Sequence, residues 1–469
     1  MKNTVTKGLV YYLFVLLSVV FGVLCIFAGI LIFSPGTEIF GFSYSYNKDS
    51  VYYLTSDPTN SSSEYLDTLI DNGNLTKIII DTDYYDVNVL NSDNVNKVEL
   101  IVKNYYSGIT KKDNRKKADI TFNYNASEKS CTLKVLGPKC TLMFSNRSQV
   151  TLALPKIKTM KNVDLQIITQ KGNITIGNSD TYFYKFKSLD IKSTEKSNIT
   201  LNKCITFANS IFINSKSGSI YQYDTQTVTS FEIQTESAKI QLTKIIAPST
   251  STRIISNSSA VSLGVIDGDL YFDSKTGLLK VNKITGKFVC SERINIANIT
   301  INEVFGEVLM QTANTSNITI DKCYGDCMIE TTSGSVTINK MYANAEIKAE
   351  SGKINVTFVP DEDLVNDNKR PMAKLITESG DIVANFNGIL KNNNTIDSTS
   401  GNVTMNFNGN LVFTLNYRCT EKTPTFAETI TSDAEKEGVI KIGGGSSDMT
   451  ITITLNKGKL DVKDTFSLS

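Results

Sequence analysis

Three carboxylates, Asp267, Asp269 and Asp326, fall in short glycine-containing turns, where they could act as the acid pair of a glycan hydrolase or lyase. An alignment of the repeats places Asp269, Lys287, Glu307 and Asp326 at one position of successive copies. Opposite charges that face each other on neighbouring strands stabilise a sheet. The spacing therefore favours a surface ladder over an active site, and a glycan-cleaving enzyme remains the third alternative.

Cysteines are the other candidates for chemistry, because the chain has eight of them, including the pair Cys323 and Cys327. In the repeat alignment both cysteines replace apolar residues, so we expect them to pack in the core as small hydrophobic side chains. A disulfide such as Cys131 with Cys140, or a metal site at Cys323 and Cys327, stays open as an alternative.

The absence of histidine excludes whole classes of site. Without imidazole there is no Ser-His-Asp or Cys-His nucleophile and no histidine-bound zinc. Charge is balanced, with Lys+Arg 48 against Asp+Glu 47, so nothing predicts nucleic-acid binding. We predict a non-enzymatic protein without a cofactor or a bound metal.

Two sets of residues could bind a partner. A basic cluster near the beginning of the chain could contact anionic lipid or cell-wall polymer, although such a cluster is more often a solvated hairpin loop; it comprises Lys111, Lys112, Arg115, Lys116 and Lys117. A polar face of Asn, Ser and Thr could contact glycan, although exposed strands favour Thr in any case; it comprises Asn173, Thr175, Asn198, Thr200, Asn298, Thr300, Asn317, Thr319, Ser335 and Thr337.

These residues follow an apolar segment at 9–33, which is long enough as a helix to cross a bilayer. Lys2 and Lys7 precede it, and no basic residue follows until Lys48. The positive-inside rule then predicts a single-pass anchor with residues 1–8 in the cytoplasm and the bulk of the chain outside. Residues 34–73, rich in Ser, Asn and Tyr, are expected to form an extracellular stalk or linker.

Beyond residue 74 the apolar residues alternate with a period of two, which is typical of β-strands. A small residue followed by alternating apolar residues recurs about every 18 to 21 residues, from Gly172 to Gly401. Such short units cannot close a core alone, but they bury a continuous apolar column when they stack. We predict an all-β fold: a parallel β-solenoid or β-helix of about 12 or more rungs over 74–462, preceded by one transmembrane helix and followed by a tail at 463–469.

The end of the solenoid is expected at 439–462, where VIKIGGGSSDMTITITLNKGKLDV alternates and carries three consecutive glycines. Stacked rungs need covered ends, because an open strand edge invites further pairing. The segment is therefore predicted to be the terminal rung.

Four stretches of the chain are informative together: KIIIDTDYYDVNVLNSDNVNKVELIV, VTLALPKIKTMKNVDLQIITQKGNITI, IETTSGSVTI and IGGGSSDMTITI. They resemble the bacterial β-strand-repeat "putative adhesin" domain family, which is related to toast-rack modules of envelope-stress proteins. The resemblance covers about residues 74 to 462 and implies a non-enzymatic adhesion or envelope role at the cell surface.

The leading hypothesis is thus a single-pass membrane protein with an extracellular solenoid that binds a cell-wall or host glycan or a membrane protein. The alternative is an envelope-stress component that binds membrane-active agents or a membrane partner, for which the basic cluster near the bilayer is the supporting feature.

Overall fold

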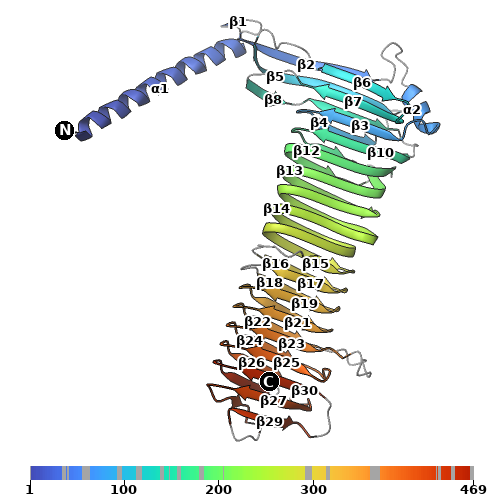
Figure 1. Ribbon diagram of the computed structural model, residues 1–469. Helices are drawn as coiled ribbons and strands as arrows, with labels where there is room; N and C mark the ends of the chain where they lie inside the picture. The colour runs from blue at the N-terminus through green and yellow to red at the C-terminus, as the bar shows by residue number, and fades with distance from the viewer. Residues whose placement is uncertain are drawn as a thin grey trace. The chain divides into compact units, whose positions relative to one another are not determined.

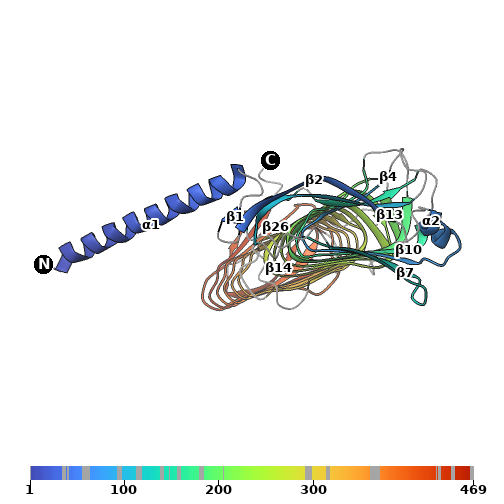
Figure 2. The same cartoon turned by 90° about the horizontal axis from the view of Figure 1, so that it is seen from above.

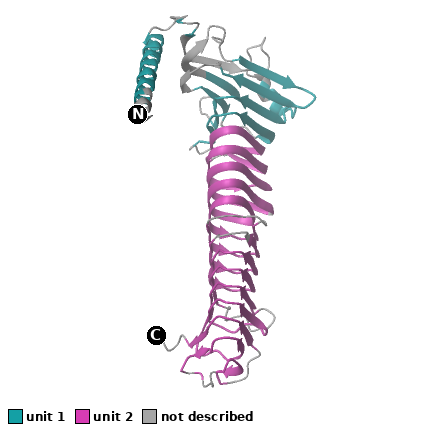
Figure 3. Ribbon diagram, turned by 60° about the vertical axis from the view of Figure 1, so that its left-hand side comes forward, with its two compact units in different colours: residues 1–182 teal, residues 183–469 magenta. Residues whose placement is uncertain are grey.

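The computed structural model describes most of the chain: residues 2–33, 38–39, 42–54, 64–91, 98–111, 119–137, 142–146, 148–155, 160–178, 184–203, 205–290, 298–312, 317–359, 370–428, 430, 435–444 and 449–464. The chain forms two compact units, residues 1–182 and 183–469 (Figure 3). Strands dominate both units, and the longest helix is α1 (Lys2–Phe33) (Figure 1).

Helix α1 is apolar around its circumference and contains a 24-residue stretch, Val10–Phe33, that is long and apolar enough to cross a membrane. Its large side chains are exposed, including Tyr12, Phe14 and Phe33. A soluble helix would bury one apolar face against a core, whereas an apolar surface on all sides suits a bilayer. The predicted N-terminal apolar helix is confirmed, and it is a candidate membrane anchor.

In unit 1 two stacks of parallel strands are built from rungs that are not in chain order. Strand β3 (Lys77–Thr82) lies between β7 (Ser130–Leu136) and β10 (Met160–Thr169). In the same way β4 (Asp86–Asn91) lies between β9 (Gln149–Leu154) and β11 (Ile174–Ile176). The first rung of the chain is therefore enclosed by later ones.

Antiparallel strands border these stacks. Strand β6 (Asp119–Asn125) pairs with β7, and β5 (Glu99–Lys111) pairs with β9 and with β8 (Leu142–Asn146). Strand β2 (Phe42–Leu54) pairs with β5 and with the short β1 (Glu38–Ile39). Helix α2 (Glu64–Asp71) precedes β3. Part of the segment expected to be a stalk is thus sheet, because the alternation in FSYSYNKDSVYYL suits a strand.

Unit 2 is a stack of parallel rungs, so the predicted all-β solenoid is confirmed (Figures 1 and 2). Its first strands run continuously around the corners: β12 (Tyr184–Leu201), β13 (Ile205–Thr227) and β14 (Ser230–Ile284). Shorter strands follow: β15 (Phe288–Cys290), β16 (Asn298–Val304), β17 (Val308–Thr312), β18 (Asn317–Cys323), β19 (Cys327–Thr331), β20 (Val336–Met341), β21 (Ala345–Ala349), β22 (Ile354–Phe358), β23 (Ala373–Thr377), β24 (Ile382–Phe386), β25 (Asn394–Ser398) and β26 (Val403–Phe407).

Inward residues form apolar columns along unit 2. Ile299 pairs with Ile318, and Ile318 pairs with Val336, all of them fully buried. One methylene group taken out of water contributes about 0.8 kcal/mol. A rung therefore gains its stability from the rungs on either side of it rather than from its own contacts.

A hydroxyl residue and a glycine build the recurring corner of unit 2. The amide of Gly380 donates a 2.9 Å hydrogen bond to the hydroxyl of Thr377, and Gly334 does the same to Thr331 at 3.2 Å. A Cβ on Gly401 would lie 1.8 Å from the carbonyl oxygen of Gly380 in the preceding rung. The recurring small residue of the sequence is therefore required by the close stacking of the corners.

The C-terminal end corrects one prediction. Strands β30 (Thr450–Leu455) and β31 (Leu460–Asp464) pair with β25 and β26 on one side, and with β27 (Phe413–Cys419) and β28 (Thr425–Phe426) on the other. The prediction of 439–462 as the terminal rung was wrong for its second part, because β30 and β31 are inserted between earlier strands. Its register fits there, since Gly458 stacks directly on Gly401.

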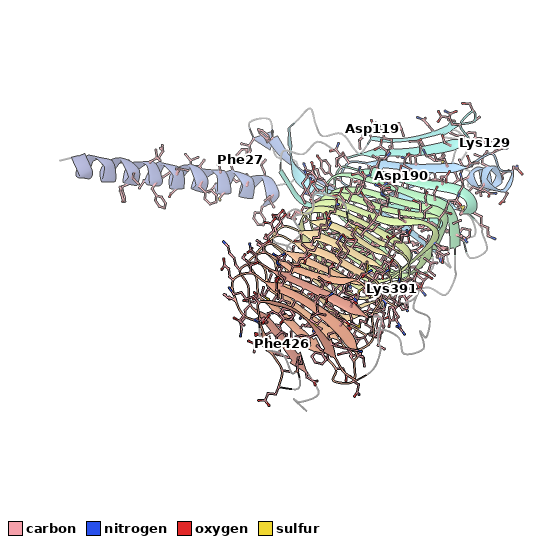
Figure 4. All side chains as sticks on the ribbon, turned by 60° about the horizontal axis from the view of Figure 1, so that its bottom comes forward. Phe27, Asp119, Lys129, Asp190, Lys391 and Phe426 are labelled. Carbon is pink, nitrogen blue, oxygen red and sulfur yellow. The ribbon has the colours of Figure 1, made fainter. Side chains whose placement is uncertain are left out.

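The covering of this end comes from β29 (Glu437–Ile442), which pairs antiparallel with β27. Tyr417 of β27 and Phe426 of β28 pack edge to face with ring centroids 5.2 Å apart. Figure 4 shows Phe426 at this end of the solenoid. Antiparallel strands thus border the parallel rungs here, as they do in unit 1.

Candidate binding surface of the solenoid

The turn between β14 and β15, and the same turn in the rungs that follow, carries the predicted ladder of alternating charge. The ammonium of Lys287 lies 2.9 Å from the carboxylate of Glu307, and the backbone amide of Lys287 donates a 2.7 Å hydrogen bond to Asp269. The Glu307 carboxylate raises the pKa of Lys287 through this hydrogen bond. The ladder predicted from the repeat alignment is confirmed at these residues.

The three candidate catalytic carboxylates bond to the following rung. Asp267 accepts a 2.7 Å hydrogen bond from the Thr285 hydroxyl. Asp326 accepts two from Asn344, one from its backbone amide and one from its side chain. Asp326 lies on a different rung from Asp267, so the structure does not bring the three together as one acid pair. Their hydrogen bonds hold successive turns in register.

A second charge ladder lies on the strand before the turn. Lys322 on β18 lies 2.7 Å from Glu303 on β16, and Lys283 is register-paired with Glu303 on the other side. The hydrogen bond from Lys322 lowers the pKa of Glu303 and raises that of Lys322. Lys340 follows Lys322, so the alternation ends there with two like charges on neighbouring rungs.

Between these ladders lies a stack of three aromatic rings that the sequence analysis missed. Phe305 and Tyr324 stack with centroids 4.5 Å apart, and Tyr324 and Tyr342 with centroids 4.7 Å apart. The Lys283 ammonium lies 4.5 Å from the Phe305 centroid, which is within range of a cation–π contact. The available signal was the residue before the small turn residue (Gly306, Gly325 or Ala343), which is aromatic in these three successive repeats.

An outward apolar column continues this surface on the strand after the turn. Leu309 on β17 pairs with Met328 on β19, and Val289 pairs with Leu309 on the other side. Phe305, Tyr324 and Met328 are exposed. We call Phe305, Tyr324, Tyr342, Leu309 and Met328 the turn face. Exposed apolar side chains clustered in this way mark contact surfaces in soluble proteins.

A polar groove lies at the corner of earlier rungs, within unit 2. Its cavity volume is about 440 Å³, and its lining runs from Ser193 to Asn257. Four of the lining residues are buried hydroxyl residues from successive rungs: Ser193, Ser215, Thr235 and Ser256. We call this cavity the corner groove.

The polar face predicted from the sequence is assembled only in part. Asn298 pairs with Asn317, and Thr300, Thr319 and Thr337 follow one another on β16, β18 and β20. Ser335 donates its backbone N–H to the side chain of Asn317 at 3.2 Å.

The remaining members of the polar face lie elsewhere. Asn198 and Thr200 pair with Ser219 and Tyr221, away from this group, and Asn173 and Thr175 belong to unit 1 around β11. As a binding site, this face remains a prediction.

Of the predicted basic cluster, only Lys111 lies in a described element, where its backbone ends β5 opposite Phe42. Lys112, Arg115, Lys116 and Lys117 lie outside the described residues. The cluster therefore remains a prediction.

The described cysteines of the strands are buried or nearly so. Cys323 pairs with Val304 and Met341, and Cys327 with Val308 and Ala345, which confirms their apolar positions. The hydrogen bond between the Cys327 thiol and the Cys323 sulfur, together with burial, raises the pKa of Cys327. Within the described part of the chain, no three Cys, Asp or Glu side chains are grouped to hold a metal.

Cys131 on β7 is a buried free thiol, and burial raises its pKa to about 12. Its suggested disulfide partner Cys140 lies outside the described residues.

Comparisons with known proteins agree with this architecture. Residues 266–463 match the family model described as Toastrack DUF4097. No curated protein matches the chain.

Two crystal structures were also matched. A "putative cell adhesion protein" from Clostridium sporogenes has 8% identity and a TM-score of 0.16, with 90% of this chain and 100% of that chain covered. A "putative adhesin" from Parabacteroides merdae has 13% identity and a TM-score of 0.17, with 66% of this chain and 92% of that chain covered.

The family match lies within the range of the predicted resemblance, and it covers the rungs that carry the turn face. Residues 266–463 are thus similar to the Toastrack DUF4097 family.

Proposed function

We propose that this protein is a membrane-anchored, non-catalytic adhesion module whose solenoid is displayed outside the cell. The observation that carries the proposal is helix α1, whose large apolar side chains are mostly exposed over Val10–Phe33. Lys2 and Lys7 precede this stretch, and the positive-inside rule orients such a helix with its N-terminus in the cytoplasm. The solenoid then follows on the outer side.

The non-catalytic part of the proposal is supported by the bonding of the carboxylates. Asp267, Asp269 and Asp326 accept hydrogen bonds from the next rung, so their charges serve the stacking of the turns. A general acid or base needs a group free to exchange a proton with the substrate. The repeated outer surface is better suited to contact than to chemistry.

The topology is tested on intact cells that express the full chain with one epitope tag at each end. We expect added protease to remove the C-terminal tag and to spare the N-terminal tag until the membrane is permeabilised. A variant with Leu17→Lys and Val20→Lys should leave the membrane fraction, because charges at the centre of a span oppose insertion. Protection of the C-terminal tag on intact cells would contradict an exported solenoid.

The turn face is the proposed contact surface. Cells displaying the full chain are compared for retention on surfaces coated with purified cell-wall material or with mucin. The variant Phe305→Ser/Tyr324→Ser/Met328→Ser should lose retention, because it removes the exposed apolar side chains of this surface. The matched control Tyr223→Ser/Leu278→Ser removes exposed apolar residues elsewhere on unit 2 and should keep it. Equal retention of both variants would exclude the turn face as the contact surface.

A further inference from the structure

The corner groove crosses the corners of four successive rungs of unit 2, at some distance in the chain from the turn face. Rungs stack about 4.8 Å apart, so four of them span about 14 Å. Its volume of about 440 Å³ is in the range of sites that hold small ligands. A site that repeats along the stack suits a linear ligand that runs parallel to the stacking direction.

Buried hydroxyl residues belong to the lining of the groove. Ser215 is 1% exposed, and its hydroxyl donates a 3.2 Å hydrogen bond to the carbonyl oxygen of Ser217. Ser193 is similarly buried, and its hydroxyl contacts that of Ser197 at 2.6 Å. These bonds fix the hydroxyl groups in the corner. A hydroxyl oxygen that donates its proton retains lone pairs that can accept.

The walls carry side-chain amides, which both donate and accept. Asn214 and Gln234 are register-paired on neighbouring rungs, and the amide of Gln234 is held by a 2.6 Å hydrogen bond to Glu232. Ile255 adds an apolar patch to the same lining. Hydroxyl, amide and aliphatic groups in one groove match a sugar ring, which has both hydroxyl groups and a C–H face.

Charge within the groove is compensated. The lining contains Lys216 on one rung and Glu236 on the next, so the two formal charges cancel. A polyanion or a polycation would meet one like charge for every opposite one. The groove therefore suits an uncharged ligand.

We propose that the corner groove binds a short segment of a linear, uncharged polysaccharide. This inference rests on the proposed function of a displayed binding module, and it gives that module a ligand class. Binding needs no covalent step, because the groove acts through hydrogen bonds and apolar contact alone.

The test uses the purified full chain in detergent micelles and isothermal titration with chitohexaose and cellohexaose. We expect at least one of these neutral oligosaccharides to bind, and 0.5 M NaCl to leave the affinity unchanged, because screening acts on charged ligands. Hexagalacturonate and hexalysine, as anionic and cationic probes, should bind at least tenfold more weakly. Failure of both neutral probes, or tighter binding of a charged one, would overturn the proposal.

Gln234→Trp is the decisive variant, because it fills the groove from a half-buried outward position. We expect at least a tenfold loss of affinity. Ile376→Trp is the matched control, because Ile376-Thr377-Glu378-Ser379-Gly380 repeats the corner Gln234-Thr235-Glu236-Ser237-Ala238 on a later rung. Equal affinities of the two variants would place the binding site elsewhere. The titration does not depend on membrane topology, so it fails or succeeds independently of the surface-display test.

Discussion

The backbone amide of Gly306 donates a 3.0 Å hydrogen bond to the carbonyl oxygen of Gly286 in the preceding rung. A Cβ on Gly306 would lie 2.3 Å from that oxygen and 2.4 Å from its carbon. Gly306 is not among the glycines with positive φ, so backbone conformation is not the reason for a glycine here. The turns stack so closely that a side chain has no room.

Gly306→Ala should therefore destabilise the solenoid, because the neighbouring backbone has to move to admit the methyl group. We expect a loss of about 2–4 kcal/mol, at the upper end of what single substitutions cost. Thermal unfolding of the full chain followed by circular dichroism measures it. Gly444→Ala is the control, since a Cβ there meets nothing within 4 Å. Equal unfolding midpoints for the two variants would contradict the close stacking.

The central ring of the aromatic stack should contribute more than either end. Tyr324 stacks on Phe305 and on Tyr342, so Tyr324→Ser removes two ring contacts. Each contact contributes about 0.5–1.5 kcal/mol, and we expect a clear fall in the unfolding midpoint. Tyr324→Phe keeps both contacts and should unfold like the wild type. If the serine and phenylalanine variants unfold alike, the stack is not a source of stability.

The ion pair of Glu303 with Lys322 predicts a pH dependence of stability. Lys322 lowers the pKa of Glu303 in the folded state, so the unfolded state holds the proton more tightly. The stabilisation is complete above the unfolded pKa of about 4.3 and is lost as the pH falls through the lower folded pKa. Glu303→Gln should reduce the unfolding midpoint at pH 7 and have little effect at pH 2.

The control for this prediction is Glu378→Gln, which removes an exposed carboxylate at a corner. Its effect on the midpoint should be small at both pH values. A Glu303→Gln effect of the same size at pH 7 and pH 2 would show that the pair contributes through packing rather than through charge.

The sequence predicted the register of the middle rungs because the repeat length there varies little. Asp269, Lys287 and Glu307 were placed at one position by alignment alone, and the structure joins Lys287 to Asp269 and to Glu307. Cys323 was likewise placed in line with Val304 and Met341. A regular repeat fixes which residues stack, because each rung rests on the one before it in the chain.

The strand order at the two ends was not predicted, because the order of the strands along the chain differs there from their order in the stack. The parallel pairing of β31 with β26 brings Leu460 next to Val403, although strands β27 to β30 lie between them in the chain. Alternation in TITITL indicates a strand but does not say which rung it adjoins. The aromatic stack was missed for a different reason: the earlier turns carry Asp267 and Thr285 at that position, so the column is not aromatic throughout.

Buried thiols should resist alkylation in the folded protein. Burial raises the pKa of Cys131 to about 12, and that of Cys290 is also raised by burial. At pH 8 few of these thiols are thiolates, which are the reactive form. Mass spectrometry after iodoacetamide treatment should find both unmodified in native protein and both alkylated in guanidinium. Rapid labelling of Cys131 in native protein would show that unit 1 opens at β7.

The insertion of β30 and β31 predicts that a short C-terminal deletion removes more than its own rung. These strands join β27 and β28 to β25 and β26, and they bury Ile451, Ile453 and Leu460 completely. In a chain ending at residue 448, β27 and β29 should therefore lose their ordered structure. Strands that lose both backbone pairing and apolar burial no longer gain enough free energy to offset the loss of conformational entropy on folding. Hydrogen exchange should then be fast throughout 411–444, whereas a chain ending at 464 should keep the protection of the full chain. Slow exchange of β27 in the shorter chain would mean that the C-terminal strands form a unit of their own, independent of the inserted rung.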